Sequence, residues 1–200
     1  MARNAISKIS NAFSTGGGGV NFEQRIQAMF LLSLLIDGFC PAMKEQTKRV
    51  CFQAKRLGFD VDDLAVFTYR NNTEGKLLIQ IKHSITATEN DNIFRDVVCA
   101  AWSDFIKEDF DKENDKIALA TVQISLKAQQ ALRYLHAAAV GAVDAAEFLD
   151  KVNLPHFSSV DNRSMLATLE NFIEKINGSK PTDFEIWMFC KAFILFLFDL

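Results

Sequence analysis

Two extended segments joined by a polar turn constrain the fold of this chain more than any other feature of its sequence. DLAVFTY (63–69) and LLIQIK (77–82) are rich in strand formers, and NNTEG (71–75) between them is rich in turn formers. Two strands with so short a connection pair as an antiparallel hairpin. A third strand-like segment, RVCFQA (49–54), precedes them. The centre of the fold should therefore be a small β-sheet.

Helical patterns flank these strands. Apolar residues recur at helical spacing over 22–37, where Asn21 is placed as an N-cap and Gly38 as the residue that ends the helix. A second helix should follow the hairpin, because Thr88 and Asp91 have the spacing of a capping box before an apolar pattern with a helical period.

The second half of the chain adds one strand and several helices. IALATVQI (117–124) has the continuous apolar character of a buried strand. Helical patterns follow at 126–140, 144–152 and 162–176, and the ending DFEIWMFCKAFILFLFDL is expected to be a helix that runs into an apolar stretch. The order of patterns predicts an α/β fold, with a small mixed β-sheet flanked by helices and a helical C-terminal extension.

The length and the apolar ending indicate how the chain is divided. A chain of 200 residues with 49% hydrophobic content can form one domain with its own core. We expect a flexible Gly-rich leader over 1–20, a core over 21–125 and the helical extension over 126–200. Because chain ends are usually polar, the apolar segment 193–200 suggests that further domains of a longer protein follow.

Charge and targeting signals exclude several classes of protein. A net charge of −3 argues against a protein that coats nucleic acid without specificity. The beginning MARNAISKISNA lacks the apolar stretch of a secretory signal, and no window approaches the roughly 18 apolar residues of a membrane span. We therefore expect a cytoplasmic protein with no membrane partner. The four cysteines include no CxxC pair and are expected to be buried free thiols.

The hairpin brings oppositely charged residues together. Side chains alternate along a strand, so Gln80 and Lys82 share one face of an otherwise apolar strand. Asp62 and Asp63 begin the preceding strand, and the start of one hairpin strand lies across from the end of its partner. The cluster is either an ordinary Asp–Lys ion pair at a sheet edge or a site for a divalent metal or a phosphate.

Four short segments carry a resemblance to a known family. FEQR in the first helix, DDL at the second strand, QIK at the third and FRDVVCAAWSDF in the next helix resemble the PD-(D/E)XK, or restriction-endonuclease-like, nuclease core. The likeness covers about 16–124 in the order helix, three strands, helix, strand. More narrowly, it is similar to Mrr-like nuclease domains at the N-termini of bacterial antiphage proteins, namely Avs-type NTPases and cyclic-oligonucleotide-activated endonuclease effectors.

The resemblance implies a metal-dependent DNA endonuclease. By analogy with the family, Asp63 and Gln80 would hold Mg²⁺, with Mn²⁺ as an alternative, and Glu23 would support the metal or its water. Asp62 remains an alternative to Asp63 as the ligand. Lys82 would orient and activate the nucleophile. Gln80 stands where the family motif has Asp or Glu, so the site should bind metal more weakly, because an amide oxygen carries no negative charge.

DNA and regulatory modules are the expected partners. The charge of the basic residues Arg49, Lys55 and Arg56, and the position of His83 and Ser84 next to Lys82, make these five the candidates for contacting the DNA backbone. An active form should be a homo-oligomer, regulated by further domains of the chain or by an NTPase or sensor module. The alternative is a catalytically inactive nuclease fold that serves as a DNA-binding or protein-interaction module.

The glycine run before the first helix remains open to two interpretations. It is not a P-loop, because no Gly-Lys-Ser/Thr follows it and no strand precedes it. The small residues either let a DNA backbone approach the helix that carries Glu23 or form a flexible lead-in.

Overall fold

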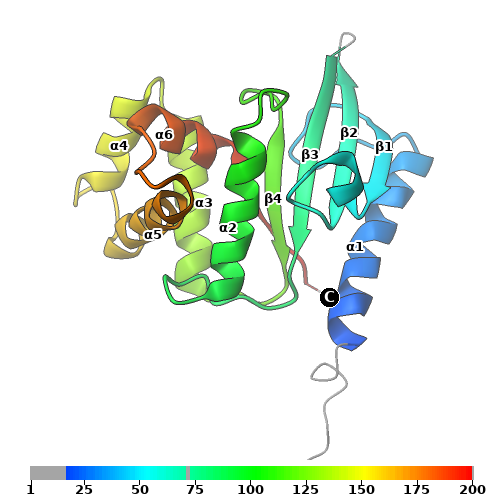
Figure 1. The fold of residues 1–200 in the computed structure, drawn as a ribbon, viewed down its shortest axis with the longest axis horizontal. Helices are drawn as coiled ribbons and strands as arrows, with labels where there is room; N and C mark the ends of the chain where they lie inside the picture. Colours follow the sequence, from blue (N-terminus) through cyan, green and yellow to red (C-terminus); the bar gives the residue numbers. More distant parts are fainter. Residues whose placement is uncertain (1–16, 71–72, 200) are drawn as a thin grey trace, which may run out of the picture.

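A five-stranded mixed sheet forms the centre of the chain. The computed structural model describes residues 17–70 and 73–199, and within them the strand order is β1-β2-β3-β4-β5 (Figure 1). Antiparallel pairs join β1 (Thr47–Phe52), β2 (Leu64–Arg70) and β3 (Thr73–Ile81). Parallel pairs join β3 to β4 (Lys116–Thr121) and β4 to β5 (Phe193–Leu197). The expected α/β class with a small mixed sheet flanked by helices is confirmed at this level.

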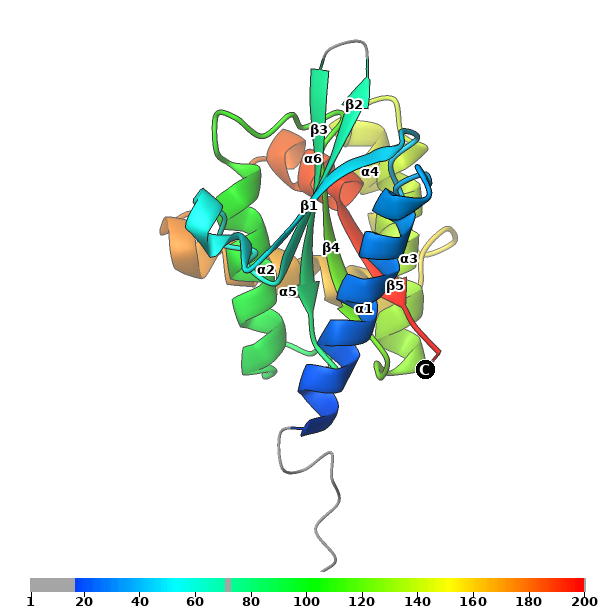
Figure 2. The same cartoon turned by 90° about the vertical axis from the view of Figure 1, so that its right-hand side faces the viewer.

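Helices cover both faces of the sheet and its far edge. Figure 2 shows α1 (Gly17–Leu35) and α2 (Asn92–Phe105) on opposite sides of the strands. The remaining helices gather beside β4 and β5, away from β1 (Figure 1): α3 (Leu126–Val140), α4 (Ala145–Asn153), α5 (Val160–Asn177) and α6 (Asp183–Ala192). None of the helices in the described ranges is long and apolar enough to cross a membrane.

The alternation of side chains along β3 divides the core into two clusters. Leu77 and Ile79 pack with Phe22, Ile26 and other residues of α1 on one face. Leu78 faces the other way and belongs to a larger cluster that α2 and the C-terminal helices share. Because residues from both sides of position 126 fill this larger cluster, the C-terminal helices and the first four strands have a common core.

The first helix has different ends from those expected. α1 begins at Gly17, so Asn21 lies within the helix and does not cap it. Gly38 does not adopt the left-handed conformation expected of it; Asp37 does, with φ 51°. Packing of the apolar α1 residues against the sheet outweighs the weak helix propensity of glycine. The leader expected over 1–20 overlaps α1 from Gly17 onward, and its first 16 residues lie outside the described part.

The length of the hairpin loop and the N-cap of the second helix also differ from those expected. β2 and β3 pair as far as Arg70 and Thr73, so the loop is shorter than expected, and Asn71 and Asn72 lie outside the described residues. Asp91 alone is the N-cap of α2, where its carboxylate accepts hydrogen bonds from the N–H groups of Ile93 and Phe94. Thr88 therefore does not take the capping position.

The apolar end of the chain contains a strand that the sequence analysis missed. α6 ends at Ala192, and β5 continues directly from it to pair with β4. Phe193 belongs to the larger core cluster and Ile194 to the smaller one, as the two-residue period of a strand requires. A continuous apolar run does not distinguish a strand buried on both faces from a buried helix, because neither has a polar face.

The cysteines are free thiols, as expected, but only half of them are fully buried. Cys40 and Cys190 are buried, and Cys51 and Cys99 are partly exposed. Burial raises the pKa of the Cys40 thiol to about 12, with a smaller contribution from the charge of Glu45. The buried thiols therefore behave as small apolar side chains.

Candidate functional site

The hairpin register places Asp63 beside the end of β3. Leu64 pairs with Ile79, so Asp63 lies next to Gln80 and Ile81. The Asp63 Oδ2 atom accepts a hydrogen bond of 2.5 Å from Gln80 Nε2 and one of 2.6 Å from the Ile81 N–H. Lys82 Nζ lies 3.7 Å from the same oxygen. The predicted convergence of an aspartate, a glutamine and a lysine at this strand end is therefore present.

Asp63 borders an open pocket of about 520 Å³. Its lining comes from three segments: Glu23 of α1, the turn after β1, and the residues directly before β2. The turn supplies Gln53, Lys55 and Arg56, and the last segment supplies Asp62 and Asp63. Asp62 and Asp63 directly precede β2, at the ends of β2 and β3 that lie away from their connecting turn. Acidic and basic side chains thus face one another across a solvent-accessible space.

Two carboxyl groups at the pocket are held in an unfavourable environment for their charge. Burial raises the pKa of Asp63, and the Ile81 N–H and the Lys82 charge oppose this only in part. Burial also raises the pKa of Glu23, and the negative charge of Asp63 adds to the effect. Glu23 additionally accepts a 2.8 Å hydrogen bond from Gln27. A cation bound between these two carboxylates would relieve both penalties.

The donor atoms at the pocket are typical of a site that holds a hard cation weakly, and not of a site that encloses a metal ion with protein ligands on all sides. Among residues 17–70 and 73–199, no three His, Cys, Asp or Glu side chains are grouped closely enough to hold a metal ion. The pocket instead offers carboxylate oxygens from Asp63, Glu23 and Asp62, and Gln80 lies beside it, bonded to Asp63. Mg²⁺ is commonly bound through one or two carboxylates and keeps several water ligands, so this set suits it.

A buried aspartate of α2 fixes the loop that carries Asp62 and Asp63. Asp104 is 1% exposed, and its carboxylate accepts hydrogen bonds from the N–H groups of Asp60 (2.9 Å) and Val61 (2.7 Å). Lys107 lies 2.5 Å from the same carboxylate. The sequence analysis did not identify Asp104. A lone acidic residue among the apolar positions of the α2 pattern was the available signal.

The turn after β1 is held in an uncommon backbone conformation. Gln53 has φ 52° and ψ 57°, the left-handed region that costs a side-chain-bearing residue roughly 1 kcal/mol. It begins the 3₁₀ helix η2 (Ala54–Leu57), which carries Lys55 and Arg56 to the pocket. The hydrogen bonds from Gln53 N to Asp63 O and from Ala54 N to Asp62 O tie this turn to the aspartates.

Replacing Gln53 with glycine should therefore stabilise the protein by up to about 1 kcal/mol, because glycine adopts this conformation without strain. The free energy of unfolding in urea measures the effect. Gln130→Gly, at an exposed position of α3, is the control and should destabilise by about 1 kcal/mol. A loss of stability in Gln53→Gly would contradict the assignment of strain.

Of the residues predicted to contact DNA, some line the pocket and others lie elsewhere on the fold. Arg49 does not line the pocket: its guanidinium lies 3.6 Å from the centre of the Phe67 ring and pairs with Glu74 at 3.2 Å. His83 packs edge-on against Phe22 of α1 with ring centroids 5.8 Å apart. Ser84 is exposed just beyond β3 and bridges to the segment after β4. Of the predicted DNA-contacting residues, only Lys55 and Arg56 border the pocket.

Comparison of the chain with family models, curated proteins and solved structures gives no match.

Proposed function

We propose that the chain is a metal-dependent DNA endonuclease that hydrolyses phosphodiester bonds at the pocket beside Asp63. The observation that carries this proposal is the convergence of Asp63, Gln80 and Lys82 at the end of the β2–β3 hairpin, next to an open pocket. The order of elements from α1 to β4 is the one that the resemblance to PD-(D/E)XK nucleases implies. A structural ion pair alone would not require a second carboxylate, Glu23, and two cationic side chains around the same space.

Asp63 and Gln80 would hold the metal ion, with Glu23 or Asp62 binding through water. Mg²⁺, or Mn²⁺ in its place, would supply Lewis acidity toward a phosphoryl oxygen and lower the pKa of a bound water. The chain's own contribution is orientation: two hydrogen bonds, from Gln80 and from the Ile81 N–H, fix the Asp63 carboxylate. A carboxylate fixed in this way needs little rearrangement when substrate arrives.

Lys82 would act on the phosphate group. Its side chain is one-third exposed, and its Nζ lies 3.7 Å from the Asp63 carboxylate. An ammonium group there stabilises the negative charge that develops on the phosphoryl oxygens during displacement. It also orients a water molecule through hydrogen bonding.

Lys55 and Arg56 would contact the DNA backbone. Both lie on η2, both line the same pocket as Glu23, and both are exposed. Cationic side chains beside a nuclease site neutralise phosphates and position the duplex without reading its bases. Cleavage should accordingly tolerate different sequences. Arg49 is occupied by Phe67 and Glu74, so its role in this proposal is structural.

The resemblance to antiphage nuclease domains supports a further part of the proposal. In this role the chain would be the effector domain of a bacterial defence protein and would act on DNA in the cytoplasm. Assembly into a homo-oligomer, with further domains or an NTPase or sensor module, would control its activity. Such control would protect the host chromosome from a nuclease that does not depend on sequence.

Gln80 favours a second candidate function. The neutral amide supplies no charge for a metal, and its Nε2 is already bonded to Asp63. A protein of this kind would bind DNA through Lys55 and Arg56, or a protein partner, without cleaving a phosphodiester bond.

Supercoiled plasmid incubated with Mg²⁺ or with EDTA distinguishes the two functions. The nuclease proposal predicts nicking with Mg²⁺ only and a loss of at least about 10²-fold in rate for Lys82→Met. Lys48→Met, which removes an exposed lysine paired with Asp37, is the matched control and should cut at the unmodified rate. Retention of the plasmid in a gel shift without nicking would favour the binding module. If the plasmid is neither retained nor nicked, the result favours a protein-interaction module.

A further inference from the structure

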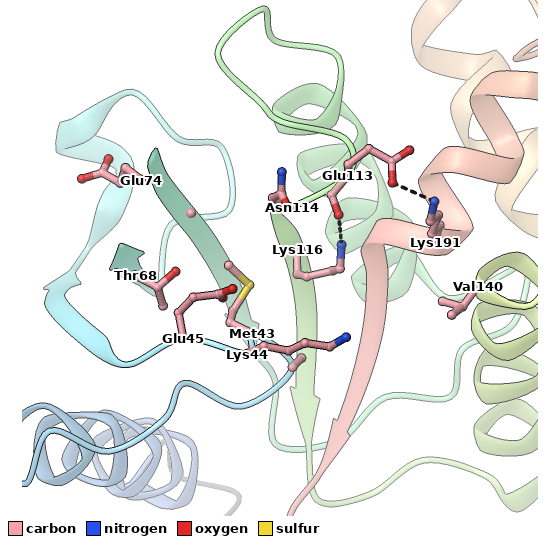
Figure 3. Close-up of a pocket in the computed structure, with 12 residues that line it drawn as sticks. Met43, Lys44, Glu45, Thr68, Glu74, Glu113, Asn114, Lys116, Val140 and Lys191 are labelled. Carbon is pink, nitrogen blue, oxygen red and sulfur yellow. Dashed lines mark hydrogen bonds and ion pairs between the residues drawn. The ribbon is translucent and has the colours of Figure 1, made fainter. Parts of the chain in front are cut away.

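A second pocket lies at the other end of the sheet from Asp63. Its volume is about 570 Å³, within the range typical of small-molecule sites. It is bordered by the loop before β1, the turn end of the β2–β3 hairpin, the start of β4, and the ends of α3 and α6 (Figure 3). The first pocket is formed at the opposite ends of β2 and β3, so the two share no lining residue.

Lys116 is the central cationic group of this second pocket. It is half-buried at the start of β4, and its amino group donates to the backbone carbonyls of Glu113 (3.0 Å) and Asp115 (3.1 Å). Among the residues that the structure describes, no carboxylate oxygen lies within the 4.0 Å of an ion pair with it. Burial lowers the pKa of Lys116 and the neighbouring charge of Lys191 lowers it further, while the charges of Asp115, Glu113 and Asp111 oppose this only in part. Its positive charge is thus incompletely compensated.

The other lysines of the pocket increase this positive charge. Figure 3 shows the side chain of Lys44 extending toward the side of the pocket formed by Lys116 and Val140. Lys44 makes no hydrogen bond or ion pair with the described part of the chain. Lys191 is paired with Glu113 at 2.8 Å. Two lysines, Lys44 and Lys116, therefore remain without a carboxylate partner on this side.

In the part of the chain that the structure describes, no acidic side chain of the pocket forms an ion pair with Lys44 or Lys116. Glu113 is used by Lys191, and Glu74 is used by Arg49 at 3.2 Å. Glu45 lies with Thr68 and Glu74 on the side of the pocket away from Lys116 (Figure 3). The pocket is therefore divided into a cationic side and an acidic side.

We propose that this pocket binds a small anionic ligand through a phosphate or carboxylate group placed between Lys116, Lys44 and Lys191. Such a group supplies the negative charge that the half-buried Lys116 lacks, and its oxygens accept hydrogen bonds from the ammonium groups. Met43 and Val140 line the same space, so the rest of the ligand contacts apolar side chains.

Calorimetric titration of the full chain with inorganic phosphate, and separately with succinate, tests this proposal at constant ionic strength and without divalent metal. We expect saturable binding of at least one probe with a dissociation constant of about 1 mM. Binding of phosphate alone or of succinate alone identifies the preferred group. Lys116→Met should weaken the affinity at least about ten-fold, and Lys44→Met, at an exposed position that does not affect folding, should weaken it about three-fold.

Two variants act as controls. Lys127→Met removes an exposed lysine on α3, and Asp63→Asn changes the first pocket; both should bind the probes as the unmodified chain does. The proposal is overturned if neither probe binds, if Lys116→Met and Lys44→Met keep the full affinity, or if Arg56→Met abolishes binding. Because these readouts need no DNA cleavage, their failure and the failure of the nuclease proposal are distinguishable.

Discussion

Replacing Asp63 with asparagine should lower the rate of Mg²⁺-dependent plasmid nicking by at least about 10³-fold. The substitution removes the negative charge that would hold the metal but keeps the shape of the side chain. The asparagine oxygen can still accept the hydrogen bond from the Ile81 N–H, so the hairpin end should remain in place. Initial nicking rates at saturating Mg²⁺ measure the effect.

Urea unfolding shows whether Asp63→Asn loses activity because the charge is removed or because the protein no longer folds. Burial raises the pKa of Asp63, which means that its ionised form destabilises the folded chain. The asparagine variant should therefore unfold at a urea concentration equal to or above that of the unmodified chain at neutral pH.

The raised pKa of Asp63 should also make the free energy of unfolding depend on pH. The folded pKa of Asp63 lies above its unfolded value, so its contribution is fully favourable below the unfolded pKa and is lost as pH rises through the folded pKa. Asparagine does not titrate, so the variant lacks this contribution.

Asp62→Asn is the matched control for Asp63. Asp62 lies beside it in the same pocket, but its carboxylate makes only a 3.5 Å contact with Gln80. We expect a loss of about ten-fold or less for this variant, because a neighbouring charge contributes less than a direct ligand. The reverse order of the two losses would assign the metal to Asp62.

Replacing Asp104 with alanine should destabilise the protein by about 3 kcal/mol. The carboxylate is 1% exposed and satisfies the backbone N–H groups of Asp60 and Val61 as well as the Lys107 ammonium. Its removal leaves buried donors without an acceptor. The midpoint of urea unfolding should fall while the dependence of the unfolding free energy on urea stays unchanged.

Asp96→Ala is the control on the same helix. Asp96 is largely exposed, and within the described ranges its one ion pair is with its neighbour Arg95, so its removal should change stability by less than about 0.5 kcal/mol. Equal effects of the two substitutions would show that Asp104 does not anchor the loop. Because that loop leads into Asp62 and Asp63, the Asp104 variant should also cut DNA more slowly at a temperature where it is fully folded.

The hairpin and its charged end could be predicted from the sequence because a strand has a fixed two-residue period. That period places Gln80 and Lys82 on one face, and the antiparallel pairing brings Asp63 to them. The roles of these residues in cleavage stay predictions. The helices of the second half were also predicted well: the helix expected over 126–140 is α3 with those bounds.

Other features depend on tertiary contacts that no local pattern contains. β5 became a strand because β4 offered a parallel edge, and its apolar run alone fits a helix equally well. Asp104 is important because a loop 43 to 44 positions earlier presents two N–H groups to it. Arg49 was predicted to contact DNA from its charge, but the aromatic ring of Phe67 lies within its reach only in the folded sheet.

Titration of Mn²⁺ into the unmodified chain, Gln80→Glu and Asp63→Asn tests the central claim most directly, because metal binding is measured by heat and does not require cleavage. Restoring a carboxylate at position 80 places a second negative charge beside Asp63, where Gln80 now lies 2.5 Å away. The account predicts that Gln80→Glu binds Mn²⁺ at least about ten-fold more tightly than the unmodified chain and that Asp63→Asn shows no saturable binding. Equal affinity in all three proteins, or no binding in any of them, would contradict it.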